Sequence, residues 1–379
     1  MPHATEMASL KIAVLGAGGG IGQSLSLLLK TELRSTCLAA ESGIHVALYD
    51  VNRDAVAGAG TDLSHINTPV TVTWHAPGGS GADDPLATCL RDAQLVVIPA
   101  GVPRKPGMTR DDLYAINARI VTTLAAGIAA HCDLSRTFVL LISNPVNSLV
   151  RVLVDTLVAS SSAGSAAAAA QEVPRRVFGL TQLDAVRAST FLHEALGRHA
   201  RDVVRVPVVG GHSGHTIVPL FSQATGQYVS ANTPHVFTDE LRDGVAALGA
   251  EALAQLVHRV QFGGDEVVKA KNGTGSATLS MAFAAAQVTR AFAELLLGVR
   301  SEIRDTLYAN VGGITRVAGD QSQELHKLTG GLRYVSLPLT ITSDGLQSYD
   351  TKWARSMTPA EQELWSGCVE ELQGSVHEK

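Results

Sequence analysis

The chain has 379 residues, of which 45% are hydrophobic and 17% are charged, so it is long enough for two coupled domains and too apolar to be disordered. Its formal net charge of −5 gives no reason to expect nucleic acid or an anionic membrane surface as a partner. No apolar run approaches the ~20 residues of a membrane helix. The four cysteines lack metal-site or CxxC spacing, which favours reduced thiols.

A glycine-rich loop follows the first apolar segment. The segment LKIAVL indicates a buried strand, and it runs directly into GAGGGIG and then into SLSLLLK, which has the apolar content of a helix. Gly16, Gly19 and Gly22 are three residues apart, in a variant of the G-x-G-x-x-G fingerprint with Ile21 at one expected glycine position. Together with Gly20 they favour close approach of a pyrophosphate to a helix N-terminus. A flexible turn is the alternative, and the flanking strand and helix argue against it.

An acidic residue ends the second predicted strand, HVALYD. The carboxylate of Asp50 can accept hydrogen bonds from both hydroxyls of an adenine ribose and would repel a 2′-phosphate. The sequence therefore predicts NAD, rather than NADP, as the cofactor. The separation from the glycines is longer than is usual, because the segment RSTCLAAESG is interpreted as an insertion before this strand.

Cations follow the buried-strand pattern LVVIPAG. Arg104, Lys105 and Arg110 lie in a stretch with two prolines and a glycine, which exclude a regular helix and predict a loop. Ligands bind at the carboxyl ends of strands in open parallel sheets, so the cations are candidates for contacts with an anionic substrate. A solvated basic loop is the alternative.

Apolar runs alternate with helical patterns up to the strand FVLLIS, as in a parallel sheet built from βαβ units. We therefore expect a dinucleotide-binding domain over residues 1–150 and a second domain over residues 151–379. The strand VVRVPVV and helices over Ala246–Val260 and Ala282–Leu297 are assigned to the second domain. Five alanines after residue 165 indicate either an expanded surface loop or an added turn of helix.

Two further motifs carry candidate proton-transfer groups. In TQLDAVR, Asp184 and Arg187 are three residues apart and so neighbours on one helical face, although a surface ion pair would give the same spacing. In GGHSG, His212 stands between small residues after a predicted strand, and an imidazole suits proton transfer near neutral pH. His215 completes an H-x-x-H pattern, but no third ligand is evident, so no metal is predicted.

Taken together, these segments resemble one family. GAGGGIG, LYD, AGVPRKPGMTR, NAR, SNPVN, TQLDAVR, GGHSG and GSATLSM occur in the order and approximate spacing of the NAD-dependent malate dehydrogenases, in the branch shared by bacteria and mitochondria within the lactate/malate dehydrogenase superfamily. The resemblance covers residues 10–300, fades beyond them and recovers in part at Tyr334–Pro338. It implies an α/β chain with an N-terminal Rossmann domain, a doubly wound parallel sheet, and a C-terminal α+β substrate-binding and catalytic domain.

The resemblance also implies an activity and its central residues. The expected reaction is the reversible NAD-dependent oxidation of (S)-malate to oxaloacetate, with the active site in the cleft between the two domains. His212 exchanges the proton as general acid and base, and Asp184 fixes its tautomer and stabilises its imidazolium form. Arg187 pairs with the C1 carboxylate of the substrate.

Other roles follow from the same family. Arg104 binds the distal carboxylate, and Arg110 polarises the carbonyl. Asn144 hydrogen-bonds the substrate or the nicotinamide ribose. Two residues, Asn117 and Met281, match positions near the cofactor, where Gly16, Gly19, Gly20, Ile21, Gly22 and Asp50 also bind. Ala277 lines the pocket.

Alternatives remain for the substrate and for the class of protein. An unpaired buried guanidinium is costly, so Arg104 favours malate over lactate or an aromatic 2-hydroxy acid. Gln182 and the altered segment after residue 300 could nevertheless reshape the pocket. A catalytically silent NAD-binding paralogue is a further reading, and the retained His212, Asp184 and Arg187 argue against it.

Partners and location follow from weaker signals. The helix QSLSLLLK has more apolar positions than one buried face needs, and the family is dimeric, so we expect a homodimer. The residues before Lys11 contain no Arg or Lys and one Glu, which supports neither a secretory signal nor an Arg-rich transit peptide. A cytoplasmic location is expected by elimination, although the family also works inside organelles.

Overall fold

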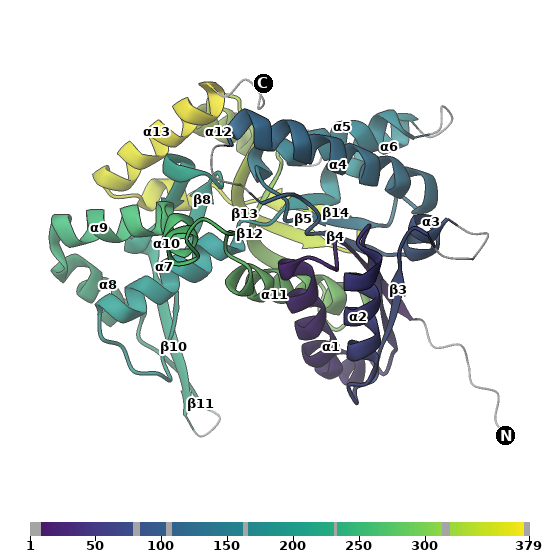
Figure 1. Cartoon of the computed structure of the whole chain (residues 1–379). Helices are drawn as coiled ribbons and strands as arrows, with labels where there is room; N and C mark the ends of the chain where they lie inside the picture. The colour runs from purple at the N-terminus through teal and green to yellow at the C-terminus, as the bar shows by residue number, and fades with distance from the viewer. Residues whose placement is uncertain are drawn as a thin grey trace. The chain divides into compact units, whose positions relative to one another are not determined.

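The apolar segments expected as strands in the first half of the chain form one parallel sheet (Figure 1). The structure, a computed structural model, describes residues 9–78, 84–103, 108–161, 166–230, 233–312 and 319–374. The parallel strands are β1 (Leu10–Leu15), β2 (Ile44–Tyr49), β3 (Val70–His75), β4 (Leu95–Ile98), β5 (Phe138–Leu141) and β6 (Val177–Gly179). Their order, β3-β2-β1-β4-β5-β6, is the order of a dinucleotide-binding doubly wound sheet. The predicted fold class is confirmed.

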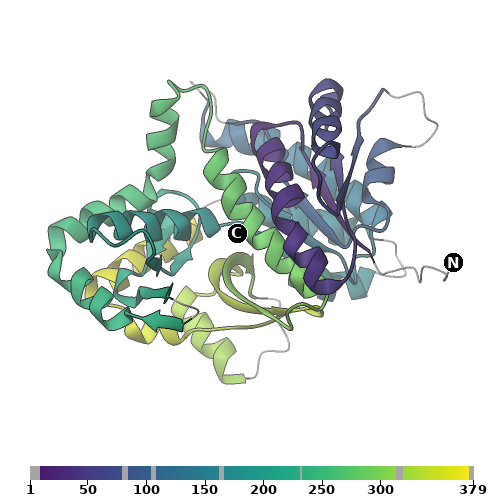
Figure 2. The same cartoon turned by 90° about the horizontal axis from the view of Figure 1, so that it is seen from below.

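Both faces of this sheet are covered by helices, which explains why its central strands are apolar along their whole length. The helices α1, α2 and α11 pack on one face and α3, α4 and α5 on the other (Figure 1). Their bounds, with those of the short α6, are α1 (Gly20–Ala40), α2 (Arg53–Ser64), α3 (Pro85–Leu90), α4 (Arg110–His131), α5 (Val146–Ala159), α6 (Ala166–Glu172) and α11 (Leu279–Leu296). In Figure 2, α11 lies alongside α1.

The chain passes between two compact units more than once. The first unit comprises residues 1–180, 277–304 and 340–347, and the second comprises residues 181–276, 305–339 and 348–379. This division differs from the expected domains 1–150 and 151–379. Helices α5 and α6, strand β6 and the returning helix α11 all belong to the first unit. Three strands have residues in both units: β12 (Ile303–Asn310), β13 (Tyr334–Thr342) and β14 (Gly345–Tyr349).

The second unit combines antiparallel strands with helices. Its other strands are β7 (Val203–Arg205), β8 (Val208–Gly210), β9 (Ile217–Pro219), β10 (Thr225–Ser230) and β11 (Thr233–Val236). Strand β8 pairs with β13 and β9, and β10 pairs with β7 and β11. The helices are α7 (Gln182–Ala195), α8 (Thr238–Ala247), α9 (Gly249–Gln261), α10 (Gly263–Ala270), α12 (Gly319–Thr329) and α13 (Pro359–Gly374). A core that includes Leu192, Val206, Phe221 and Val260 holds α7 and α9 against these strands.

Several local expectations are corrected by the structure. The run VVRVPVV is two strands in different sheets, because Pro207 falls between β7 and β8 and cannot donate a ladder hydrogen bond. The helix expected over Ala246–Val260 is interrupted at Gly249, whose φ is +79°. The alanine run, for which a loop and an added helical turn both stood open, is helical and forms α6. Most of the segment RSTCLAAESG, interpreted as an insertion, is helical and extends α1 to Ala40.

One helix among the described residues, over Asp111–His131 within α4, has the length and apolar content of a membrane span. Core helices of globular proteins pass the same test. This helix packs against α5 and α3 of the first unit, and 28% of its apolar window is buried.

Candidate active site

The glycine loop is closed tightly against the end of β4 and the start of α1. Gly16 has a φ of +100°, and a Cβ there would lie 2.5 Å from the backbone of Ala100. A Cβ on Gly22 would lie 2.1 Å from the carbonyl oxygen of Gly16. Real Cβ atoms do not approach backbone so closely, so both positions require glycine. The predicted turn can therefore form only with glycine at these two positions.

The N-terminus of α1 is left open for an anion. Gly19 is its N-cap and supplies no side-chain hydrogen bond, and a Cβ on Gly19 would meet only the Gly16 carbonyl oxygen, at 3.5 Å. Within the described residues, nothing accepts a hydrogen bond from the amides of Gly20, Ile21 and Gly22. Three unsatisfied amides at the positive end of a 21-residue helix suit the pyrophosphate of a dinucleotide.

Asp50 is fixed beside this loop. Its Oδ2 accepts a hydrogen bond from the Gly18 amide at 2.8 Å, and its Oδ1 accepts one from the Asn52 amide at 2.9 Å. A carboxylate has about four acceptor sites, so two remain for the hydroxyls of a ribose. The same negative charge opposes a 2′-phosphate, which agrees with the predicted preference for NAD.

Asn117 joins two loops at the carboxyl edge of the sheet. Its Oδ1 accepts from the Val102 amide at 2.8 Å, and its Nδ2 donates to the carbonyls of Val102 at 3.2 Å and Asn144 at 2.7 Å. The buried amide of Asn117 is thus occupied by backbone groups, and the residue positions the loops after β4 and β5. The side chain of Asn144 itself is exposed and so accessible to a ligand.

Met281, predicted near the cofactor, and Ala277, predicted to line the pocket, lie in and just before α11. Met281 is buried in the first unit, and Ala277 precedes the helix. The methyl group of Thr278, between them, would lie 3.2 Å from a Cβ on Gly20. This contact places the start of α11 beside the glycine loop.

The two predicted loop cations are only partly located. Arg104 lies outside the described residues. Arg110 is the first residue of α4, so it starts a helix and does not lie on the loop as expected. That helix begins with a capping box, in which Thr109 accepts from the Asp112 amide and Asp112 accepts from the Thr109 amide. The turn chemistry fixes where the helix starts.

The second unit brings His212 and Asp184 into direct contact. Nδ1 of His212 lies 2.6 Å from Oδ2 of Asp184, and the Asp184 side chain is completely buried. A carboxylate oxygen accepts hydrogen bonds, so Nδ1 is the donor of this hydrogen bond and carries a hydrogen. This hydrogen bond orients the ring and fixes its tautomer. Asp184 also stands in the first turn of α7, where the helix dipole stabilises its negative charge.

A self-closing turn holds His212 at its apex. Gly211 donates to the carbonyl of Thr216 at 2.8 Å, and Ser213 and Thr216 form a capping box between them. Gly210, with a φ of +101°, would place a Cβ 2.3 Å from the Thr216 oxygen and 2.7 Å from Sγ of Cys368. The Cys368 thiol of α13 hydrogen-bonds the same oxygen at 3.2 Å. The C-terminal helix therefore supports the turn.

Arg187 lies one helical turn after Asp184. Its Nη1 is 3.9 Å from Oδ1 of Asp184, and its side chain is 13% exposed, so the guanidinium retains access to a ligand. Burial lowers the pKa of Arg187 from its usual value, and Asp184 and then Glu266 oppose that shift. A Cβ on Gly263 would come within 3.1 Å of the Arg187 side chain, so this glycine of α10 leaves room for it.

Cys368 and Gly263 were not predicted as supports of these residues. Gly210 stands within the GGHSG segment, where its neighbour His212 could have drawn attention to it. Cys368 and Gly263 have no sequence signal, because their partners are far away along the chain. Over the described residues, no cluster of three or more His, Cys, Asp or Glu side chains is placed to hold a metal ion.

These features define a class of protein. A parallel sheet of this order with a glycine turn and an acid after β2 belongs to dinucleotide-binding domains. A buried histidine–carboxylate pair with an arginine beside it adds a proton-transfer site that can also bind a carboxylate. Together they define a nucleotide-linked dehydrogenase of acidic substrates.

Comparisons with known proteins give the family. The lactate/malate dehydrogenase NAD binding domain family matches residues 10–166, and the lactate/malate dehydrogenase alpha/beta C-terminal domain family matches residues 181–379. The chain belongs to the lactate/malate dehydrogenase family. The predicted family and the NAD cofactor are confirmed, and the family match continues beyond residue 300, where the motifs fade.

Relatives that cover most or nearly all of the chain carry consistent names. The cytoplasmic malate dehydrogenase of Saccharomyces cerevisiae is 44% identical, covering 99% of this chain and 96% of its own length. The mitochondrial malate dehydrogenase of the same yeast is 38% identical, covering 97% and 92%. The malate dehydrogenase of Pseudoalteromonas translucida is 45% identical, covering 80% and 82%.

Solved structures agree on the fold. The apo malate dehydrogenase of Picrophilus torridus superposes with a TM-score of 0.70 at 21% identity, covering 96% of this chain and 95% of the other. The malate dehydrogenase of Cryptosporidium parvum has a TM-score of 0.68 at 24% identity, covering 97% of each chain.

Proposed function

We propose that this chain is an NAD-dependent dehydrogenase that oxidises (S)-malate to oxaloacetate reversibly. The observation that carries the proposal is the buried pair of His212 and Asp184, 2.6 Å apart, with Arg187 one helical turn away. The names of the full-length relatives support malate as the substrate. NAD, bound at the glycine loop and Asp50, supplies the hydride acceptor for the reaction.

His212 and Asp184 move and stabilise the proton. In oxidation, Nε2 of His212 takes the proton from the malate hydroxyl. The carbon that carries this hydroxyl loses a hydride to NAD, and the product is oxaloacetate. In reduction, the imidazolium returns that proton to the carbonyl oxygen. Asp184 holds the ring through Nδ1 and stabilises the imidazolium formed in oxidation.

Three arginines are assigned to the substrate. Arg187 pairs with the C1 carboxylate in a bidentate geometry that guanidinium and carboxylate groups share. Arg104 binds the distal carboxylate and Arg110 polarises the carbonyl, as the family resemblance implies. Asn144 completes the set, with its exposed amide available to the substrate or the nicotinamide ribose.

An absorbance assay at the NADH band tests the proposal with oxaloacetate, pyruvate and phenylpyruvate side by side. We expect turnover to be greatest with oxaloacetate. A preference for pyruvate or phenylpyruvate would overturn malate as the substrate and leave the dehydrogenase assignment intact. Absence of turnover with all three, in a protein that still binds NADH, would favour the silent paralogue.

Arg104→Gln tests which residue recognises the distal carboxylate. Loss of one partner of a desolvated charge pair costs ~2–5 kcal/mol, or roughly 30- to 5000-fold in kcat/KM. We expect this loss for oxaloacetate and little change for pyruvate, which has a methyl group in place of the second carboxylate. Equal losses for both substrates would mean that Arg104 positions the loop. Arg136→Gln, an exposed arginine that is not in the proposed site, is the matched control.

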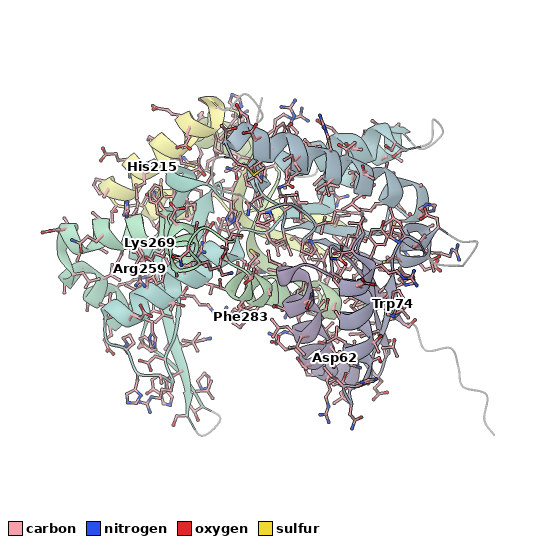
Figure 3. All side chains as sticks on the ribbon, in the orientation of Figure 1. Asp62, Trp74, His215, Arg259, Lys269 and Phe283 are labelled. Atoms are coloured by element: carbon pink, nitrogen blue, oxygen red, sulfur yellow. The ribbon has the colours of Figure 1, made fainter. Side chains whose placement is uncertain are left out.

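We also propose that the chain forms a homodimer through the outer faces of α1 and α11. Leu27 on α1 and Leu279 and Phe283 on α11 are exposed apolar residues on helices whose other faces are packed, and Phe283 projects outward in Figure 3. A cytoplasmic location is proposed as well, in line with the yeast cytoplasmic relative. Mitochondrial and peroxisomal relatives also match, so imaging of a fluorescent fusion is the test.

A further inference from the structure

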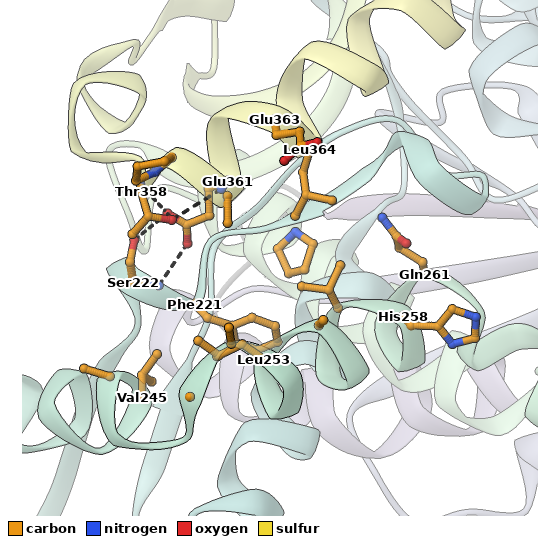
Figure 4. A pocket seen from close by; sticks show the side chains of 18 of the residues that line it. Phe221, Ser222, Val245, Leu253, His258, Gln261, Thr358, Glu361, Glu363 and Leu364 are labelled. Carbon is orange, nitrogen blue, oxygen red and sulfur yellow. Dashed lines mark hydrogen bonds between the residues drawn. The ribbon is translucent and has the colours of Figure 1, made fainter.

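A large apolar groove lies in the second unit, between α9 and α13 (Figure 4). Its volume is about 990 Å³, and Phe221, Val245, Leu253, Val257 and Leu364 contribute apolar walls. None of the described residues proposed for malate oxidation lines it. Small-molecule sites are commonly clefts of up to about 1,000 Å³, lined mainly by apolar side chains with a few polar groups that orient the ligand. The groove is therefore a candidate site that the dehydrogenase reaction does not explain.

One end of the groove carries a cation without a carboxylate partner. Arg242 of α8 lines the groove, and its Nε donates to the Ala224 carbonyl at 3.3 Å. Among the described residues, no carboxylate forms an ion pair with it. Ala224 directly follows the 3-10 turn Phe221–Gln223, so Arg242 lies toward the end of the groove that Ser222 marks in Figure 4.

The buried acid at that end is already satisfied. Glu361 accepts hydrogen bonds from the amide and hydroxyl of Ser222, at 3.0 and 2.6 Å, and from the amide and hydroxyl of Thr358, at 2.9 and 3.1 Å. These four donors spread its negative charge. Glu363, the other lining carboxylate, is exposed on α13. Among the residues that the structure describes, the charge of Arg242 is thus the one left without an opposite charge at the Ser222 end.

The opposite end is polar but does not demand a charge. His258 and Gln261 mark it in Figure 4, and Gln261 donates to the Ile217 carbonyl at 3.0 Å. His215, labelled in Figure 3, also lines the groove and packs edge-on against Phe262. His258 packs against the same ring at a tilt. His215 belongs to the turn that carries His212, so the groove borders the element that holds the proposed acid–base residue.

We propose that this groove binds a linear fatty acyl carboxylate. The acyl chain lies along Leu253, Val257 and Leu364, and the carboxylate pairs with Arg242. A small dicarboxylate would leave the apolar walls in contact with water, whereas a neutral hydrocarbon would leave Arg242 unmatched. A molecule with one anionic end and a long apolar body satisfies both features.

Calorimetric titration with octanoate, decanoate and dodecanoate, each below its micellar concentration, tests the proposal. Each added methylene that is buried should tighten binding by up to about fourfold. Acetate should not bind in the groove. Decanol should bind through its apolar chain and form no ion pair with Arg242. Absence of saturable binding, or an affinity independent of chain length, would overturn the proposal.

Variants separate the charge from the apolar walls. Arg242→Gln should weaken decanoate binding by about fivefold, the upper range for an exposed ion pair, and leave decanol binding unchanged. Arg205→Gln, an exposed arginine on β7 outside the groove, should change neither. If Arg242→Gln leaves decanoate binding unchanged, the carboxylate is not bound by Arg242 and the assignment fails.

Leu253→Glu places a carboxylate in the wall and should abolish binding of every chain length, while Val229→Glu, an exposed site on β10, should not. The thermal unfolding midpoint shows that each variant is folded. If Leu253→Glu does not fold, Ala254→Phe fills the same groove from α9. Decanoate binding that persists in a folded groove variant would overturn the proposal. Loss of self-association in Leu253→Glu would also overturn it, because the groove would then be an interface between copies of the chain. Oxaloacetate turnover is measured separately, so a failure of the dehydrogenase proposal is distinguishable from a failure of this one.

Discussion

Asp184 connects the imidazole and the guanidinium of the proposed proton-transfer site. One carboxylate oxygen accepts from Nδ1 of His212, and the other lies 3.9 Å from the Arg187 guanidinium. Asp184 is fully buried, so its charge depends on these neighbours and on the N-terminus of α7. A single residue thus orients the base and stabilises the arginine that is proposed to bind the substrate.

Replacement of His212 tests its role directly. Asn cannot take up a proton at neutral pH, so His212→Asn should lower kcat by ~10²–10⁴-fold in both directions, as is typical for loss of a general acid–base. Turnover of oxaloacetate with NADH and of malate with NAD measures the effect. His235→Asn, at an exposed position on β11, is the control and should retain activity. Near-full turnover of His212→Asn would remove His212 from the mechanism.

Two neighbouring histidines, His45 on β2 and His75 on β3, connect protonation to the stability of the fold. Nε2 of His45 and Nε2 of His75 contact the hydroxyl of Thr73 at 2.8 and 3.0 Å. Burial and then the charge of Lys11 lower the pKa of both imidazoles, and for His75 the proximity of His45 adds to the shift. The unfolded chain therefore binds these protons more readily than the folded chain does.

Because the unfolded state takes up more protons, stability should fall as pH decreases through the unfolded histidine pKa of ~6.5. We expect the thermal unfolding midpoint to drop between about pH 7.5 and about pH 5.5, and the drop to be smaller for His75→Asn. His235→Asn should follow the unmodified protein. Identical pH dependence in His75→Asn and the unmodified protein would contradict this account.

At the scale of elements, local patterns predicted the strands of the first unit well. Their apolar runs are buried on both faces, so composition alone distinguishes them. The run VVRVPVV was predicted as one strand, because periodicity does not report that Pro207 separates two sheets. Helix α11 was assigned to the second domain, yet it packs on α1. The partner of a helix is decided by long-range packing that its own sequence does not specify.

The candidate site divides in the same way. Residues whose chemistry is local, such as Gly16, Asp50 and His212, were identified from short motifs. Asn117 was predicted near the cofactor, and the structure shows that its amide holds two backbone loops. Cys368 could not be found from the sequence, because its contact with the His212 turn spans 152 residues of chain.

The start of α1 gives a matched test of the glycine loop. A Cβ on Gly22 would lie 2.1 Å from the Gly16 carbonyl oxygen, whereas a Cβ on Gly58 in α2 meets no atom within 4 Å. Gly22→Ala must displace the loop and should weaken NADH binding by roughly 5- to 160-fold, by analogy with the ~1–3 kcal/mol of an overpacked site. Gly58→Ala should leave NADH binding unchanged and stabilise the protein by about 0.5–1 kcal/mol. Fluorescence titration of NADH and thermal unfolding measure the two effects. Equal NADH affinity of both variants would show that the loop adapts.

At the scale of the whole molecule, the groups of the proposed reaction are shared between the two units. The glycine loop and Asp50 belong to the first unit, and His212, Asp184 and Arg187 belong to the second. Residues 277–304 return to the first unit after most of the second has been formed. Neither unit is therefore one continuous segment, and a fragment that ends at residue 150 would lack both β6 and α11.

Exposed apolar residues on α1 and α11 predict that the whole molecule self-associates. Leu279 and Phe283 are 74% and 42% exposed on α11, and Leu27 is 46% exposed on α1, the helix against which α11 packs. Exposed apolar side chains grouped on two contacting helices are typical of an interface.

Light scattering at micromolar concentration should give twice the 39.6 kDa of one chain. Phe283→Asp combined with Leu279→Asp should shift the mass to that of a monomer, because burying unpaired carboxylates in an apolar contact is unfavourable. Val229→Asp, equally apolar and exposed but on the β10 hairpin, should remain dimeric. A monomeric mass for the unmodified protein would exclude the dimer, and a dimer that survives the double substitution would move the interface away from α11.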